Sequence, residues 1–118
     1  MVTLVLPFVM ITIREYIDSN GHSPLTKWFS GLNAPAAAKV TTSLVRIEQG
    51  NFSNTKGVGA GVFECRIDFG PGYRIYFEKD GNTLVILVGG GTKKRQDTDI
   101  KVVHERWKDY KERKAREI

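Results

Sequence analysis

The stretch from Phe63 to Glu78 reads FECRIDFGPGYRIYFE and carries the strongest structural signal in the chain. Apolar and polar residues alternate on both sides of its centre, which is the pattern of half-buried β-strands. The centre itself is Gly70-Pro71-Gly72, a combination of residues that is typical of a turn. The stretch therefore predicts a β-hairpin with one apolar face and one polar face.

The hairpin register follows from the requirement that the two apolar sets share a face. A three-residue loop meets it by placing Phe69 opposite Tyr73, whereas a two-residue loop would set Phe69 against Arg74. The predicted register contains four more pairs: Ile67 with Ile75, Cys65 with Phe77, Asp68 with Arg74, and Arg66 with Tyr76. The polar residues would then form one charged, exposed surface, which suits a polyanion or an acidic partner protein.

The segments before the hairpin predict one strand and two helices. Residues 11–16 alternate between apolar and polar, as in a half-buried strand. Ser23-Pro24 and then Asn33-Ala34-Pro35 each read as a helix start, and apolar residues follow both at helical spacing. Gly50 has the character of a helix C-terminus. We therefore expect two short amphipathic helices that pack together as an αα-hairpin.

The other segments predict a loop, a buried strand and a last helix. Residues 51–61 are polar and glycine-rich, which indicates a mobile loop. Residues 83–88 are continuously apolar, as in a central strand covered on both faces, and a glycine triplet ends them. Thr98-Asp99 can cap a final helix whose core-facing residues are Ile100, Val103, Trp107 and Tyr110. The expected fold is α+β, with a small antiparallel sheet in the order β-α-α-β-β-β-α.

Length and composition indicate one basic globular domain over residues 1–118. The chain has 18 Lys and Arg against 13 Asp and Glu, a net charge of +5 and a sequence pI near 9.5. The single Cys65 and the lack of a Cys/His cluster predict a reducing, cytoplasmic environment without a disulfide, metal or cofactor. The apolar residues 1–9 are too short to span a membrane, and Met10 suggests that they are an extension from an upstream start.

Two coupled segments resemble a known toxin family. The hairpin, with Glu64-Cys65-Arg66-Ile67 and Gly72-Tyr73-Arg74, is joined through an apolar strand to Thr92-Lys93-Lys94-Arg95-Gln96. This combination resembles the phage-derived Gp49-like branch of the RelE/ParE superfamily, called addiction module killer proteins and related to HigB toxins. The resemblance implies a RelE/ParE-like fold and a type II toxin that cleaves messenger RNA at the ribosome. It also implies a cognate antitoxin, usually with a helix-turn-helix DNA-binding domain, and a toxin that alone is a monomer or weak dimer.

The implied chemistry is attack of a ribose 2′-hydroxyl on the adjacent phosphate, which needs a proton acceptor, a proton donor and cations. Arg74 is the first candidate for the phosphate, because a guanidinium can hold two oxygens at once. The predicted catalytic set is Arg74, Arg66, Lys94, Tyr76 and Lys93, and the predicted RNA-binding set is Lys56, Arg95 and Lys93. Glu64 is a conceivable general base that could instead pair with a loop lysine.

Each candidate also has a purely structural interpretation. Arg74 would form a surface ion pair with Asp68, and the stem of Arg66 would pack beside Tyr76. Tyr76 favours an exposed strand face for its β-propensity alone, and the lysine-rich run would be a solvated loop. His22 and His104 lie outside the hairpin, so we expect them to be surface or packing residues.

Two other functions stay open at this level. A ParE-like toxin would bind DNA gyrase without cleaving RNA, and a degenerate toxin would only bind its antitoxin. The hairpin favours the nuclease, whereas the absence of a histidine from the hairpin favours the other two.

Overall fold

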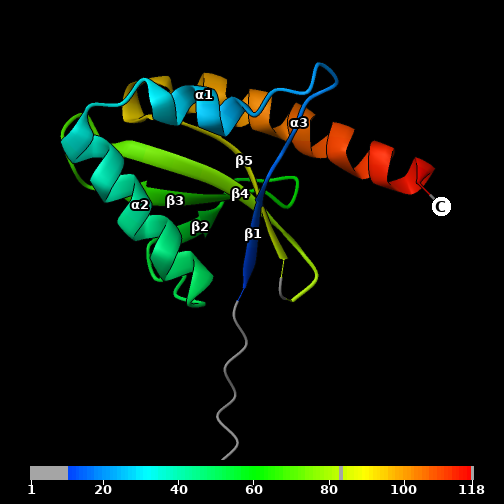
Figure 1. Ribbon diagram of the computed structural model, residues 1–118, viewed down its shortest axis with the longest axis horizontal. Helices are drawn as coiled ribbons and strands as arrows, with labels where there is room; N and C mark the ends of the chain where they lie inside the picture. The colour runs from blue at the N-terminus through cyan, green and yellow to red at the C-terminus, as the bar shows by residue number, and fades with distance from the viewer. Residues whose placement is uncertain (1–10, 83, 118) are drawn as a thin grey trace, which may run out of the picture.

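The computed structural model describes residues 11–82 and 84–117, which form one β-sheet with helices on both faces (Figure 1). In chain order the elements are β1 (Thr12–Glu15), α1 (Pro24–Ser30), α2 (Ala34–Glu48), β2 (Thr55–Gly57), β3 (Phe63–Ile67), β4 (Tyr73–Asp80), β5 (Leu84–Thr92), the 3₁₀ turn η1 (Lys93–Arg95) and α3 (Gln96–Arg116). The α+β class is confirmed. The expected N-terminal extension at residues 1–9 and residue Thr83 of the expected strand lie outside the described residues.

The sheet is mixed, with strands in the order β1-β5-β4-β3-β2. β1 runs parallel to β5, so the expected purely antiparallel sheet is wrong. Alternation of apolar residues shows which face of a strand is buried, but it does not show whether the neighbouring strand is parallel or antiparallel. The direction of β1 relative to β5 could therefore not be predicted from its sequence. The expected mobile loop at residues 51–61 is also wrong in part, because β2 lies within it and pairs with β3.

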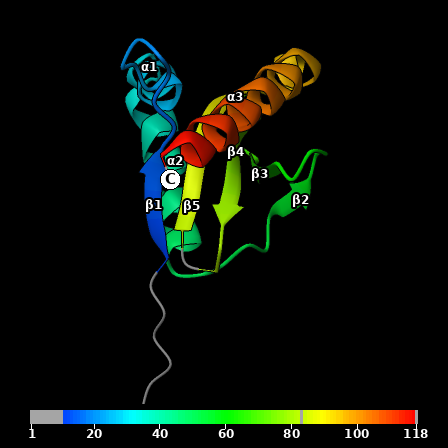
Figure 2. The same ribbon diagram turned by 90° about the vertical axis from the view of Figure 1, so that its right-hand side faces the viewer.

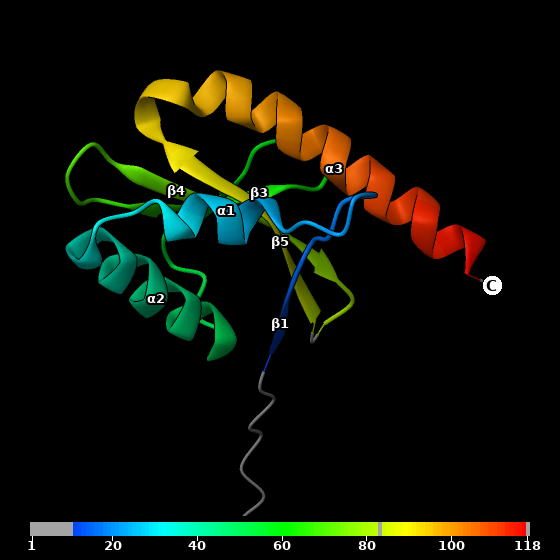
Figure 3. The same ribbon diagram turned by 45° about the horizontal axis from the view of Figure 1, so that its top comes forward.

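The first two helices begin at the predicted caps. The side chain of Ser23 accepts a hydrogen bond from the Thr26 amide, and that of Asn33 accepts one from the Ala36 amide. Gly50, with a φ of 80°, follows the end of α2. Both helices lie on one face of the sheet (Figure 3), α1 against β5 and α2 against β3. The expected αα-hairpin is wrong, because the apolar sheet face offers each helix a larger partner.

β3 and β4 form the predicted hairpin, but in a register displaced by two residues. Tyr73 pairs with Ile67, and Arg74 pairs with Arg66, in place of Phe69 and Asp68. The other predicted pairs are replaced by Cys65–Ile75, Glu64–Tyr76 and Phe63–Phe77. The Gly72 amide donates a hydrogen bond to the Phe69 carbonyl and closes the turn. Phe69 therefore belongs to the turn and not to the paired residues of β3 and β4. A shift of two keeps every side chain on its predicted face, since the strand period is two.

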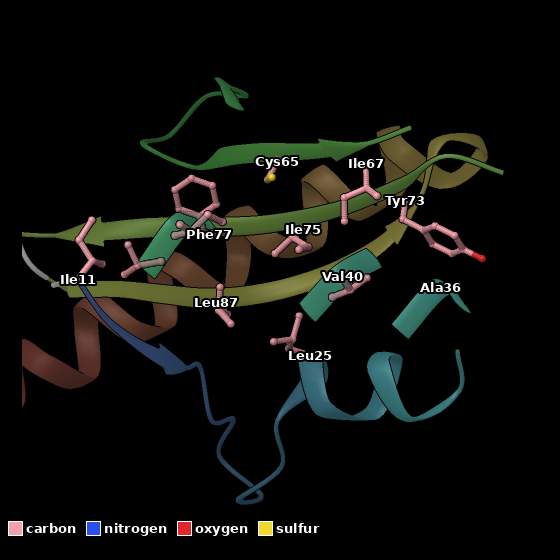
Figure 4. Close-up of a cluster of buried hydrophobic side chains, with 12 residues drawn as sticks. Ile11, Leu25, Ala36, Val40, Cys65, Ile67, Tyr73, Ile75, Phe77 and Leu87 are labelled. Carbon is pink, nitrogen blue, oxygen red and sulfur yellow. The ribbon is translucent and has the colours of Figure 1, made fainter. Parts of the chain in front are cut away.

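Two apolar clusters lie on opposite faces of this sheet. The larger one lies between the sheet and the first two helices and includes Ile75, Leu25 and Val40 (Figure 4). α3 crosses the other face, where Val103 and Trp107 are buried (Figure 2). Ile100 and Tyr110 pack against the same cluster, so the predicted inward-facing residues of the last helix are confirmed.

The polar face of the hairpin is largely covered, which contradicts the expected open surface. Glu64, Arg74, Tyr76 and Glu78 are all buried, whereas Arg66 is exposed. The cover is α3 and the turn before it, which run along this face of β4 and β5. The strand pattern could not reveal that a helix from 20 to 30 residues farther along the chain would dock there.

The glycine triplet lies inside β5, not beyond its end. A Cβ at Gly89 would lie 2.6 Å from Nη1 of Arg106, and a Cβ at Gly90 would overlap the ring of Trp28. The missing side chains let α3 and α1 approach opposite faces of one strand. α3 begins at Gln96, so the predicted cap at Thr98-Asp99 is wrong and these residues lie in its first turn.

Candidate nucleic-acid interface

Glu64 of β3 is the centre of a buried polar cluster at the start of α3. Its side chain is 1% exposed. Nε2 of Gln96 donates a hydrogen bond to Oε2 of Glu64 at 2.6 Å. Oε1 of Glu64 lies 3.4 Å from Nε of Arg74 and 3.9 Å from Nζ of Lys56. The carboxylate therefore holds together β2, β3, β4 and α3, and the expected pairing of Glu64 with a loop lysine is confirmed.

Arg66 and Arg74 lie directly opposite each other on β3 and β4. Like charges at opposed positions repel, because the Cβ atoms of such a pair are only about 5 Å apart. Each guanidinium has a carboxylate of its own: Nε of Arg66 lies 3.9 Å from Asp68, and Arg74 is paired with Glu64. Arg74 is buried while 61% of the Arg66 side chain is exposed, so only Arg66 presents its charge freely to solvent. A bound anion would relieve the repulsion between the two arginines.

The turn η1 brings a third cation to the arginine pair. The amide of Lys93 donates a hydrogen bond to the carbonyl of Gly72 at 2.8 Å. Gly72 has a φ of 78°, which favours glycine, and a Cβ there would touch Cβ of Lys93 at 3.4 Å and Nη1 of Arg74 at 3.5 Å, so the three residues lie close together. Lys93 and Lys94 are exposed. The structure thus brings together the predicted residues Arg66, Arg74, Lys93 and Lys56.

Tyr76 lies next to this cluster but is fully buried. It pairs with Glu64 across the strands, and its hydroxyl has no hydrogen-bond partner within residues 11–82 and 84–117. Burial, followed by the nearby carboxylates of Glu64 and Asp99, raises the pKa of the Tyr76 phenol. The expected exposed position of Tyr76 is therefore wrong, since α3 covers its ring.

Three polar residues of this interface were missed by sequence reasoning. They are Gln96, which binds Glu64; Asp99, whose Oδ2 is buried; and Glu78, whose Oε1 is buried. For Oδ2 of Asp99 and Oε1 of Glu78 the described part of the chain offers no hydrogen-bond partner. Burial raises the pKa of both carboxyl groups, that of Glu78 to about 8. The polar strand face did contain a signal for Glu78, but nothing in the sequence indicated which helix would cover it.

Comparison with known proteins places the chain in a family. Residues 27–108 match the family described as phage derived protein Gp49-like (DUF891). This range includes α2, the strands β2 to β5 and the polar cluster around Glu64. The chain belongs to this family. The Gp49-like family is associated with toxin-antitoxin systems. A protein of Haemophilus influenzae (strain ATCC 51907 / DSM 11121 / KW20 / Rd), described as uncharacterized, is 48% identical over 75 residues, which cover 63% of this chain and 76% of that protein.

The histidines of this Gp49-like chain lie away from the arginine pair, and Cys65, next to Arg66 in β3, faces the other side of the sheet. His22 is exposed in the turn before α1, and Nε2 of His104 is 3.0 Å from the carbonyl of Val58. The prediction that they are surface or packing residues is confirmed. Cys65 faces the apolar core as predicted, and burial raises the pKa of its thiol.

Metal-binding and membrane-spanning features were searched over the same residues. Across residues 11–82 and 84–117, no three His, Cys, Asp or Glu side chains come close enough together to hold a metal ion. The helices described for this Gp49-like chain also include none that is both long and apolar enough to cross a bilayer.

Proposed function

We propose that this Gp49-like chain is the toxin of a type II toxin-antitoxin system and that it cleaves messenger RNA. The observation that carries the proposal is the opposed pair of Arg66 and Arg74, with Lys93 beside them and the Glu64 carboxylate next to Arg74. With Lys56, four cations face the two carboxylates of Glu64 and Asp68, which leaves an excess of positive charge at this end of the sheet. Each guanidinium group is planar and can donate two parallel hydrogen bonds to the oxygens of a phosphate. A phosphodiester is therefore the anion that suits the two arginines best.

The cleavage step assigns a role to each group of the cluster. The 2′-oxygen of a ribose forms a bond to the adjacent phosphorus, and the bond from phosphorus to the 5′-oxygen of the next nucleotide breaks. Glu64 accepts the proton of the 2′-hydroxyl, and a water molecule at the exposed side of the cluster gives a proton to the leaving oxygen, because the Tyr76 hydroxyl is buried beneath α3. Arg74 and Arg66 stabilise the developing negative charge on the phosphate, and Lys93 and Lys94 add to the field.

RNA is held by the exposed cations around the cluster. Lys56 on β2 lies at one side of Glu64, and Arg95 lies at the end of η1 on the other side. Ser53, Asn54 and Thr55 line a hollow with Lys56, Glu64 and Arg66, which gives the carboxylate a path to solvent. These residues accept the sugar-phosphate backbone without reading its sequence.

An antitoxin and the ribosome are the proposed partners. The chain carries a net charge of +5, so an acidic segment of a cognate antitoxin would be attracted to the cations that bind RNA. Covering Arg66 and Lys93 would block access to the phosphate. Binding of mRNA on the ribosome would use the same charges in the absence of the antitoxin.

Primer extension on cellular messages tests the cleavage proposal. The wild type, Arg66→Ala and the control Lys108→Ala, which removes an exposed lysine from α3, are induced without antitoxin. We expect cuts within translated frames for the wild type and the control, and at least ten-fold fewer cuts for Arg66→Ala at equal protein level. Arrested growth with intact messages would refute the nuclease.

A second candidate function is supported by the burial of Tyr76 and Arg74 beneath α3. A toxin that acts through protein binding needs neither residue to be accessible, as in a ParE-like toxin of DNA gyrase. That function predicts DNA damage with intact messages in the experiment above. Intact messages with normal growth would instead indicate a degenerate toxin that only binds its antitoxin.

A further inference from the structure

A second cationic groove lies between α1 and α3, next to the last residues of β5. Its volume is about 400 Å³, in the range of sites that bind a small molecule or one nucleotide. Lys27 and Trp28 line it from α1, Arg95 and Arg106 line it from η1 and α3, and Gly90 forms its floor.

The groove exists because β1 is shorter than β5. β1 pairs with β5 only from Leu84 to Leu87, so the rest of β5, from Val88 to Thr92, has no strand beside it on this edge among the described residues. Nη1 of Arg106 donates a hydrogen bond to the Val88 carbonyl at 2.8 Å and so covers the first part of the free edge. Beyond it, the ring of Trp28 packs directly on Gly90 and forms one wall of the groove.

The charge of the groove is positive. Lys27 and Arg95 are exposed, and Arg106 is half-buried with its guanidinium at the free edge. The opposing carboxylate is Asp99, whose Oδ2 is buried without a hydrogen-bond partner in the described residues. Burial raises the pKa of Asp99, which weakens its ability to neutralise three cations.

The groove is continuous with the proposed cleavage site through η1. Lys93, the first residue of η1, lies beside Gly72 and Arg74, and Arg95, the last, lines the groove. A single strand of RNA with one phosphate at the arginine pair can therefore follow the cations of η1 around the end of β5. An aromatic side chain beside such a path is a common platform for an unpaired base.

We propose that the α1–α3 groove binds a nucleotide of the RNA substrate that neighbours the cleaved phosphodiester, with its base against Trp28 and its phosphate between Lys27 and Arg95. This inference rests on the proposed function, because it extends the path of the same RNA strand. Because Arg106 covers the free edge of β5, a peptide strand cannot pair with this edge. The groove therefore binds its ligand through side chains.

Fluorescence anisotropy with labelled 2′-O-methyl oligouridylates tests the subsite, since the methyl group prevents cleavage. A dinucleotide has one phosphodiester and can occupy only the arginine pair, whereas a decamer reaches the groove as well. We expect Lys27→Ala and Arg95→Ala each to weaken binding of the decamer by roughly five-fold and to reduce its salt slope by about 1. Lys27→Ala should bind the dinucleotide like the wild type, as should the control Lys108→Ala.

Trp28 fluorescence supplies a readout that does not depend on charge. In a Trp107→Phe background, which leaves Trp28 as the one tryptophan, the decamer should quench the emission and the dinucleotide should not. Circular dichroism and a thermal melt establish that this background is folded. If it is not, quenching is measured in the wild type, where acrylamide accessibility separates half-buried Trp28 from buried Trp107.

The outcomes separate the subsite from the proposed function. Equal binding of the decamer by the wild type, Lys27→Ala and Arg95→Ala would overturn the subsite, while weaker binding by Arg66→Ala would still support the cleavage site. Absence of RNA binding by the wild type would overturn both. Normal RNA binding by Lys27→Ala together with lost binding of the antitoxin would also overturn the subsite, because the groove would then be a protein-docking surface.

Discussion

Replacing Glu78 by glutamine should remove a large part of the pH dependence of stability. Glu78 is 2% exposed, lies beside Gly61 and Trp107, and has its Oε1 buried without a hydrogen-bond partner in the described structure. Burial raises the pKa of its carboxyl from 4.5 to about 8, although the charge of Lys111 opposes the shift. The native state therefore keeps a proton that the unfolded chain has already lost at neutral pH.

The sign and size follow from this difference in bound protons. The stabilisation is complete below pH 4.5, where both states are protonated, and it is lost as the pH rises through about 8. In between, the free energy of unfolding should fall by up to about 1.4 kcal/mol for each pH unit, which gives at most about 2.3 kcal/mol from pH 6 to pH 8. A loss of about 1 kcal/mol or more would support the buried carboxyl.

Urea unfolding at pH 6 and pH 8 measures this difference. Glu78→Gln should be nearly as stable as the wild type at pH 6, where Glu78 is uncharged, and more stable than the wild type at pH 8. Glu112→Gln, which replaces an exposed glutamate on α3, should keep the wild-type pH dependence. The same change from pH 6 to pH 8 in the wild type and in Glu78→Gln would refute the reasoning.

Three further substitutions test the packing around the proposed site. Gly90→Ala forces a methyl group into the ring of Trp28 and should lower the free energy of unfolding by about 1–3 kcal/mol, whereas Gly57→Ala, which meets nothing within 4 Å, should change it little in the same denaturant titration. Asn33→Ala removes the N-cap of α2 and should cost about 1 kcal/mol, with recovery by aspartate at this position; equal midpoints of all three proteins would contradict the cap. Tyr76→Phe removes a buried hydroxyl without a partner in the described structure, so it should unfold at the wild-type temperature or higher, and a selective loss of RNA cleavage in primer extension would assign the proton transfer to that hydroxyl.

Local patterns in the sequence predicted the elements well. Ser23-Pro24 and Asn33 mark the helix starts, because capping depends on a side chain and an amide only three residues apart. The hairpin and the faces of its strands followed from alternation, which depends on strand geometry alone. The register of the hairpin did not follow from alternation. Pairing Tyr73 with Phe69 and pairing it with Ile67 put the same side chains on the same face, so the pattern cannot choose between the two.

The sequence predicted which residues form the candidate site, but it did not predict their burial or their ion-pair partners. Arg66, Arg74, Lys93 and Lys56 were singled out from the hairpin and the basic turn, and the structure brings them together. Pairing of Arg74 with Glu64, in place of Asp68, depended on the register.

Residues close along the chain account for the α+β class, the caps of the first two helices, the hairpin and the cations at its end, which is why these features could be predicted. Three features could not be predicted in this way: β1 is parallel to β5, α3 buries Tyr76 and Glu78, and three glycines lie inside β5 between two helices. Those features require contacts between segments tens of residues apart. The sequence of a strand shows which of its faces is polar. Whether that face is buried or exposed depends on whether another segment of the chain packs against it.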